Sequence, residues 1–479
     1  MSSPLDAIFK AYDVRGTVPD QLDSRTSRAI GEAFARFAGA SRVVVGRDMR
    51  RSGEELAGAF AEGVRAAGVD VVDVGLVSTD LLYFASGHLD APGAMFTASH
   101  NPAAYNGIKF CLAGARPVGQ ETGLADVQAM AAAILAGDVG APSTGDAGAA
   151  DQLAGSGPAR TERPTGTVSS MDLLDAYAAH VRSFIDVASL RPLRVVADTA
   201  NGMGGLVVPR VLDGLPVELH MLYPELDGTF PNHPADPIQP ENLRDLQAAV
   251  VRHRADIGLA FDGDADRVFL VDEHAQPVSG SLTTALVARG MLADHPGATV
   301  LYNLICSKVV PETIVEAGGV PVRTRVGHSF IKQTMAETGA VFGGEHSGHY
   351  YFRDNYRADS GIIAALMVLQ EMSRRHAPLS ALLAPLRRYW SSGELNTEVP
   401  DPAGTVEALA GHLAAQQVST DRSDGLTAEY EDWWFNLRPS NTEPLLRLNV
   451  EAADAESGEQ HVAEVLAMVG QPAKGGARQ

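Results

Sequence analysis

The fold is set by a pattern that begins with RVVVGRD at residues 42–48. This β-branched apolar run is followed by a helical pattern over about 52–67, a glycine, and a second apolar run over 69–74. The same succession begins again at residues 194 and 299. Strands that alternate with helices indicate sheets with helices on both faces. We therefore predict an α/β protein with three similar α/β domains, whose mixed sheets are covered by helices.

The composition changes twice along the chain. Residues 135–169 are rich in Gly, Ala, Ser, Pro and Thr and show little apolar periodicity, so we expect a flexible excursion there. Beyond residue 385, strand-like runs around 433–437 and 445–450 accompany a helical pattern over 404–417, which predicts a smaller C-terminal α+β domain. The expected domains are 1–170, 171–275, 276–383 and 384–479, with a disordered tail over 471–479.

Composition and charge restrict the class of protein. The chain has 479 residues, 45% of them hydrophobic, and a formal net charge of −21. This charge argues against nucleic acid or an anionic membrane as a partner, because either needs a basic face. Cys111 and Cys306 have neither paired nor metal-ligand spacing, and no segment is typical of a signal peptide or a membrane span. We expect a cytoplasmic protein, monomer or homodimer, that binds small molecules.

An acidic loop, DGDADR at residues 262–267, lies between the apolar runs 257–261 and 268–271. Its carboxylates alternate, so they can converge where one strand ends and the next begins, and repelling charges this close need a hard cation. A calcium-binding helix-loop-helix fits less well, since Arg267 stands where that loop needs Gly and the flanks are typical of strands. A solvated acidic turn is the other alternative, but it leaves three carboxylates between buried strands without a counter-charge. We interpret the loop as a divalent-metal site.

A second loop, TASHNP at residues 97–102, follows a short apolar run. Ser99 beside His100 could be a nucleophile or a phosphate carrier, or both could belong to an ordinary turn. Lys109 follows shortly after this loop, and Arg15 lies near the N-terminus in YDVRG. Either cation could serve an anionic substrate, and either could equally be a surface charge.

A third loop, GGEHSGH at residues 343–349, also follows an apolar pair. Glu345, Ser347 and His349 alternate and can point the same way, and a carboxylate suits neighbouring sugar hydroxyls. His328, upstream, could reach the same place, although a lone histidine is more often structural. A polar turn is the alternative interpretation.

A fourth loop, RPSNTEP at residues 438–444, lies between two strand-like runs of the C-terminal domain. Arg offers a fork of donors, and Ser, Asn and Thr side chains with backbone N–H groups can complete a phosphate cradle. The alternative is again a plain polar turn.

The order of these motifs resembles the α-D-phosphohexomutase family over essentially the whole chain, from YDVRG through TASHNP, DGDADR and GEHSGH to RPSNTEP. After the third loop, YYFRD at 350–354 and DSG at 359–361 are similar to the bacterial phosphomannomutase/phosphoglucomutase branch. Phosphoglucosamine mutases, which typically carry Gln where His346 stands, are the alternative. The resemblance implies four domains around a central cleft, each contributing one loop. It also implies reversible interconversion of mannose 1-phosphate and mannose 6-phosphate, and of the glucose pair, with hexose 1,6-bisphosphate as intermediate and activator.

The resemblance further implies a role for each motif residue. Ser99 carries a phosphoryl group, and one Mg²⁺ per chain is held by Asp262, Asp264, Asp266 and a phosphoserine oxygen. The other implied catalytic residues are Arg15, His100, Lys109, Arg267 and His328, with Lys109 and His328 as candidates for proton transfer. The implied substrate-binding residues are Tyr12, Glu345, Ser347, His349, Arg438, Ser440, Asn441 and Thr442. A metal-dependent sugar-phosphate phosphatase and a non-catalytic sugar-phosphate-binding protein stay open as other classes.

Overall fold

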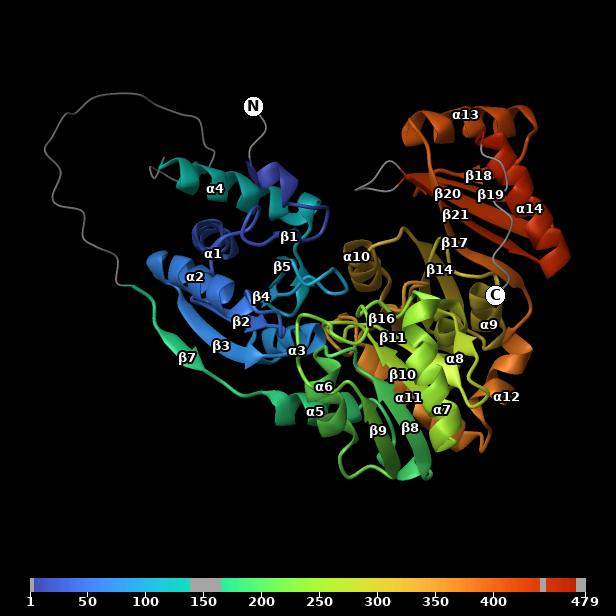
Figure 1. Ribbon diagram of the computed structural model, residues 1–479, viewed down its shortest axis with the longest axis horizontal. Helices are drawn as coiled ribbons and strands as arrows, with labels where there is room; N and C mark the ends of the chain where they lie inside the picture. The colour runs from blue at the N-terminus through green and yellow to red at the C-terminus, as the bar shows by residue number, and fades with distance from the viewer. Residues whose placement is uncertain (1–3, 138–164, 440–444, 471–479) are drawn as a thin grey trace, which may run out of the picture.

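The computed structural model describes residues 4–137, 165–439 and 445–470 (Figure 1). Three sheets accompanied by helices follow one another along the chain, and a fourth, antiparallel sheet lies towards the C-terminus. The predicted fold class, three α/β domains and a smaller C-terminal α+β domain, is confirmed. None of the described helices has the length and apolarity needed to cross a bilayer.

The first sheet is buried on both faces. Val43 and Val45 of its central strand pack in one core with Phe34 and Phe60, whereas Val44 faces a second core on the other side. A strand covered on both faces is apolar without alternation, as the run at 42–48 is.

The first domain has the strand order β1-β5-β4-β2-β3-β7, with β6 beside β5. Its strands are β1 (Val14–Thr17), β2 (Arg42–Arg47), β3 (Asp70–Leu76), β4 (Gly93–Phe96), β5 (Tyr105–Leu112), β6 (Arg116–Pro117) and β7 (Val168–Ser170). Its helices are α1 (Ser24–Ala38), α2 (Gly53–Ala66), α3 (Thr79–Leu89) and α4 (Leu124–Ala136).

One strand of the first sheet, β7, overlaps the end of the predicted excursion. β7 pairs in parallel with β3, and all of its residues are exposed. An exposed edge strand has no buried face whose apolar residues could mark it in the sequence. Residues 138–164 of the excursion and the predicted tail 471–479 lie outside the described residues.

The second sheet has the order β12-β11-β10-β8-β9, and the third has the order β14-β13-β15-β16. The second contains β8 (Leu193–Asp198), β9 (Val217–Leu222), β10 (Ile257–Phe261), β11 (Val268–Asp272) and β12 (Pro277–Val278), with helices α5 (Leu174–Arg182), α6 (Gly204–Leu212) and α7 (Arg244–His253). The third contains β13 (Thr299–Asn303), β14 (Val320–Thr324), β15 (Phe342–Gly344) and β16 (Tyr350–Phe352), with helices α8 (Gly280–Asp294), α9 (Val309–Glu316), α10 (His328–Thr338), α11 (Gly361–Arg374) and α12 (Leu379–Leu383). Both sheets combine parallel pairs with one or two antiparallel strands at an edge, so they are mixed as predicted.

The fourth sheet is antiparallel, with the order β17-β21-β20-β19-β18. Its strands are β17 (Trp390–Glu398), β18 (Ser419–Asp421), β19 (Leu426–Glu429), β20 (Trp433–Pro439) and β21 (Leu445–Ala452), and its helices are α13 (Pro402–Ala415) and α14 (Ala455–Met468). It has a hydrophobic core of its own.

Three of the four predicted loops lie at the carboxyl ends of strands that run parallel to a neighbour. TASHNP follows β4, DGDADR follows β10, and GEHSGH follows β15. Ligand sites of α/β sheets gather at these ends. The fold therefore brings together loops that are far apart in the sequence.

Candidate active site

The metal loop, residues 262–267, is buried between β10 and β11. Its three aspartates are at most 1% exposed. Asp262, Asp264 and Asp266 each offer one carboxylate oxygen, and these oxygens all lie within 4.8 Å of one another. Ala265 adopts a φ of +59°, which turns the chain tightly enough for the alternate carboxylates to converge.

Two basic side chains balance part of this negative charge. Lys109, from β5 of the first domain, places Nζ 2.8 Å from Asp264 Oδ2 and 2.6 Å from Asp266 Oδ2. Arg267 Nε donates to Asp262 Oδ2 at 2.9 Å. Arg267 belongs to the loop itself, whereas Lys109 comes from another domain and is not a free surface charge.

The charges shift one another's pKa values. Burial alone would raise the pKa of Asp264, but the Lys109 ammonium holds it well below its usual range. Burial raises the pKa of Asp262 well above its usual value, against the attraction of Arg267. Burial alone would lower the pKa of Lys109, yet Asp264 and Asp266 raise it well above normal. Lys109 is therefore an ammonium ion at neutral pH.

The loop still has unsatisfied oxygens. Asp264 Oδ1 and Asp266 Oδ1 are buried and accept no hydrogen bond from any described residue. A buried carboxylate oxygen without a donor is costly, and oxygen ligands of this kind suit a hard divalent cation. The residues present therefore fit a metal ion.

The serine loop of the first domain reaches the metal loop of the second. Ser99 is 5% exposed, and its Oγ donates to Asp262 Oδ2 at 2.8 Å. Arg267 Nη2 lies 3.4 Å from the same Oγ. His100 Nδ1 also lies 3.4 Å from it, on the solvent side of the loop. One hydroxyl therefore faces both a carboxylate of the metal loop and a guanidinium.

The serine loop is itself held by Arg50, a residue that the sequence analysis missed. Arg50 is buried, and its Nε lies 3.2 Å from Asp48 Oδ2. Its guanidinium donates at 2.7–2.9 Å to the backbone carbonyls of Ser99, Asn101, Pro102 and Tyr105. The only local signal is that Arg50 lies just after β2, at the sheet edge where the serine loop also lies.

Arg15 lies beside the serine loop. It donates to Asn101 Oδ1 at 2.5 Å and to Asp13 Oδ2 at 2.5 Å, so a local acid orients it towards the loop. Tyr12, three residues earlier, reaches the third domain through Tyr12 Oη and Val326 O, 3.5 Å apart. The segment at 12–16 thus contacts both the serine loop and the third domain.

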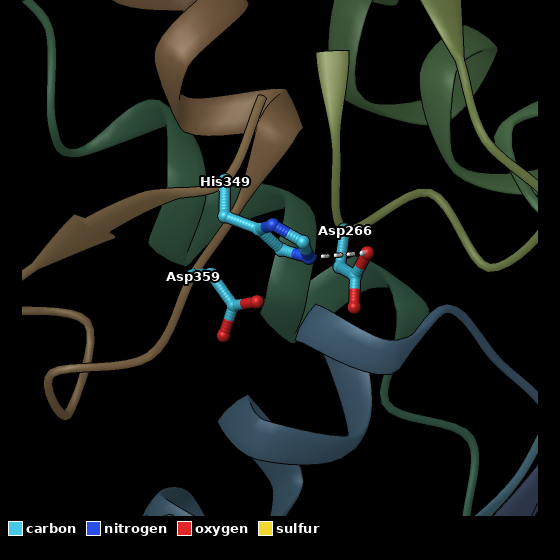
Figure 2. Close-up of side chains that lie close together, drawn as sticks. All are labelled: Asp266, His349 and Asp359. Carbon is cyan, nitrogen blue, oxygen red and sulfur yellow. Dashed lines mark ion pairs between the residues drawn. The ribbon is translucent and has the colours of Figure 1, made fainter. Parts of the chain in front are cut away.

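The third loop meets the metal loop through His349, Asp266 and Asp359 (Figure 2). His349 Nε2 lies 3.8 Å from Asp266 Oδ1, and its Nδ1 lies 3.6 Å from Glu345 Oε2 and 3.0 Å from Ser347 Oγ. The predicted group Glu345, Ser347 and His349 is therefore one cluster. A backbone bond from Val268 N to Gly348 O, 3.3 Å, ties this loop to the strand after the metal loop.

Glu345 is oriented by its surroundings. Tyr351 Oη donates to Glu345 Oε2 at 2.8 Å, and Asn303 Nδ2 and Gly327 N donate to Oε1 at 3.2 Å each. Asn303 was not singled out from the sequence, and Tyr351 appeared there only within the YYFRD motif, without a site role. A side chain held by this many donors can present a fixed acceptor to a ligand.

The remaining predicted residues are less closely connected. Arg438 is the next-to-last residue of β20, and its Nη2 lies 2.9 Å from Glu394 Oε2. Ser440, Asn441 and Thr442 lie outside the described residues. His328 begins α10, but the placement of its side chain is not described. The roles of these residues stay predictions.

Four domain models of one family match the chain in order. They are the phosphoglucomutase/phosphomannomutase alpha/beta/alpha domains I, II and III, at residues 6–134, 175–276 and 279–389, and the C-terminal domain at 394–468. This chain belongs to the phosphoglucomutase/phosphomannomutase family. The family resemblance inferred from the motif order is confirmed, whereas the domain boundaries given above stay predictions.

Individual relatives of the family agree with the domain match. A phosphomannomutase of Salmonella typhimurium is 38% identical over 471 residues, which cover 97% of this chain and 99% of that protein. A phosphohexose mutase of Xanthomonas campestris is 39% identical over 464 residues, covering 96% and 98%. The crystal structure of a phosphoglucomutase/phosphomannomutase family protein from Burkholderia thailandensis aligns with a TM-score of 0.83 at 33% identity, covering 98% of both chains. By this relationship the chain is an isomerase that moves a phosphoryl group within a sugar phosphate, and its site contains an acidic triad able to bind a metal.

Proposed function

We propose that this chain interconverts mannose 1-phosphate and mannose 6-phosphate, and likewise the glucose pair, through a phosphoryl group carried on Ser99. The observation that carries this proposal is the contact between Ser99 Oγ and Asp262 Oδ2, 2.8 Å, with Arg267 at 3.4 Å. A serine that only stabilised a turn would not need a metal loop and a guanidinium from another domain. A phosphoryl group at this position needs both, because its transfer depends on charge stabilisation.

The reaction consists of two phosphoryl transfers that use the same residues. First, a bond from phosphorus to a sugar hydroxyl oxygen forms as the hydroxyl proton passes to a basic group, and the bond between phosphorus and Ser99 Oγ breaks as an acidic group such as Lys109 gives a proton to Oγ. The resulting hexose 1,6-bisphosphate turns end for end. In the reverse transfer its other phosphoryl group moves to Ser99, which leaves the isomeric monophosphate.

The charged residues of the site have distinct tasks in these transfers. Arg267 contacts Ser99 and Arg15 contacts Asn101, so both would stabilise the transferring group at the serine loop. Lys109 is charged, which suits it to donate a proton or to stabilise charge rather than to accept a proton. His328 is the remaining candidate for the acceptor. Asp262, Asp264, Asp266 and an oxygen on Ser99 would hold one Mg²⁺, which supplies further charge neutralisation when bound.

The third and fourth loops select and hold the sugar. Glu345 would accept hydrogen bonds from the O3 and O4 hydroxyls, and Ser347 would donate one to them. The phosphate that is not reacting would be held by Arg438, Ser440, Asn441 and Thr442. Contacts at O3 and O4 are available in both orientations of the bisphosphate. Since the mannose and glucose series differ at C2, a site that contacts mainly O3 and O4 accepts both.

Substrate scope tests this sugar contact. We expect kcat/KM for mannose 1-phosphate and glucose 1-phosphate to agree within roughly tenfold, because neither series loses a contact at O3 or O4. Initial rates on these two sugars and on glucosamine 1-phosphate, each with hexose 1,6-bisphosphate present, give the comparison. A clear preference for glucosamine 1-phosphate would assign the chain to the phosphoglucosamine mutases instead. Release of inorganic phosphate without isomerisation would identify a phosphatase.

Arg438→Ala tests the clamp on the distal phosphate. Loss of a charged hydrogen bond costs about 2 kcal/mol, so we expect KM for mannose 1-phosphate to rise roughly 30-fold with kcat little changed. Arg422→Ala is the matched control, because Arg422 pairs with Glu407 on the surface of the same domain. A large fall in kcat at unchanged KM in Arg438→Ala would contradict the clamp.

A further inference from the structure

The amino end of α3, in the first domain, contacts the metal loop of the second domain. Thr79, the first residue of this helix, is fully buried. Its Oγ1 donates to Asp264 Oδ2 at 2.6 Å, and its backbone N–H donates to the Asp264 carbonyl at 3.0 Å. The first N–H groups of a helix have no partner within the helix, so this second bond satisfies a group that would otherwise be unpaired. Thr79 of the first domain thus donates hydrogen bonds to both the side chain and the backbone carbonyl of Asp264 in the second domain.

The next residue, Asp80, fixes the position of this helix end. Its buried carboxylate accepts from Tyr177 Oη of the second domain at 2.5 Å and from Ser360 Oγ, the N-cap of α11 in the third domain, at 2.6 Å. Ser78, the N-cap of α3, donates to the other oxygen of Asp80. The turn that carries Thr79 is therefore hydrogen-bonded to all three α/β domains.

The two oxygens of Asp264 have different surroundings. Oδ2 accepts from Thr79 Oγ1 and from Lys109 Nζ, whereas the buried Oδ1 accepts no hydrogen bond from any described residue. With Oδ2 occupied by two donors, Oδ1 is the oxygen left for a cation. Groups that hydrogen-bond a metal ligand fix its orientation and commonly contribute 10- to 100-fold to metal affinity, as order-of-magnitude values.

We propose that Thr79 is a positioning residue for the divalent cation. Its hydroxyl holds Asp264 in the orientation that offers Oδ1, so the cation site of the second domain is completed by a side chain of the first. The inference rests on the proposed function, since it takes the three aspartates to be the metal ligands.

Thr79→Val tests the hydroxyl alone, because Val has nearly the same shape. We expect the dissociation constant for Mn²⁺, measured by the electron paramagnetic resonance signal of the free ion on the full chain, to rise about tenfold or more. Thr79→Ser keeps the hydroxyl and should bind within roughly twofold of the unsubstituted protein. Ser86→Ala is the matched control, since Ser86 is another buried hydroxyl of α3, which donates to the Ala91 carbonyl at 2.7 Å and not to a residue of the metal loop.

The outcomes separate this inference from the proposed function. If the unsubstituted protein binds Mn²⁺ and Thr79→Val binds it with the same affinity, the role of Thr79 is overturned and the metal site stands. Equal weakening in Thr79→Val and Thr79→Ser would also overturn it, because the hydroxyl would then not be responsible. No Mn²⁺ binding by the unsubstituted protein would remove the metal site itself. If Thr79→Val does not fold, Thr79→Ala gives the same test without an added methyl group facing Asp264.

Discussion

Ser99→Ala is expected to lower kcat for the conversion of mannose 1-phosphate to mannose 6-phosphate by about a thousandfold or more, because it removes the atom that carries the phosphoryl group. Ser99 Oγ is the hydroxyl that contacts both Asp262 and Arg267. The backbone of its loop is fixed by Arg50, so the loop should keep its conformation without the hydroxyl. Turnover is measured with saturating hexose 1,6-bisphosphate and Mg²⁺.

The control for this prediction is Ser27→Ala. Ser27 is also a fully buried serine of the first domain, and its Oγ donates to the Leu56 carbonyl at 2.7 Å between two helices. Its loss should cost about 1 kcal/mol of stability and leave turnover unchanged. Near-normal turnover in Ser99→Ala would remove Ser99 from the mechanism.

Asp262→Asn is expected to lower turnover without lowering the stability of the metal-free protein. This carboxylate is both a proposed metal ligand and the partner of Ser99, so we expect turnover at saturating Mg²⁺ to fall by roughly two orders of magnitude or more. Stability without metal should not fall. Burial and the repulsion of Asp264 and Asp266 raise the pKa of Asp262 in spite of Arg267, so ionising this group in the folded protein costs stability as the pH rises above the ordinary aspartate pKa. A neutral Asn removes that cost.

The measurement is the melting temperature with EDTA and with Mg²⁺. Asp262→Asn should match or exceed the unsubstituted protein in EDTA and lose most of the rise that Mg²⁺ produces. Asp272→Asn is the control, because Asp272 is a buried carboxylate at the end of the next strand that pairs with Arg387 at 3.0 Å. It should lower the melting temperature and keep the response to Mg²⁺. A large loss of stability in EDTA for Asp262→Asn would contradict this account of its charge.

Local sequence predicted the loops but not the contacts between them. The metal loop is predictable because its alternating carboxylates lie between two apolar runs, and the structure indeed gathers them within 4.8 Å. The partnership of Lys109 with Asp264 and Asp266 depends on how β5 packs against another domain, which no local pattern records. The short exposed strand β7 carries no apolar periodicity, so its segment resembles the rest of the excursion.

Residues that position the loops, rather than carry the chemistry, were not predicted from the sequence for a related reason. Arg50 donates to backbone carbonyls, and Thr79 donates to a carboxylate of another domain. Neither contact needs a particular neighbouring sequence, because each is made across space by a buried side chain. In the sequence, Arg50 is one of several arginines in GRDMRRSG and Thr79 begins an apolar helical pattern, so neither stands out. The chemistry-bearing loops are thus easier to predict than the residues that position them.

The most direct test of the central claim is the phosphorylation of Ser99 during turnover. The full chain is incubated with hexose 1,6-bisphosphate and Mg²⁺, and the modified residue is located by mass spectrometry of its peptides. We predict one phosphoryl group on Ser99, absent from Ser99→Ala, which then appears in a hexose bisphosphate when mannose 1-phosphate is added. Two results would contradict the proposed mechanism. One is isomerisation of mannose 1-phosphate by a chain whose Ser99 never carries a phosphoryl group. The other is a phosphoryl group on a different residue.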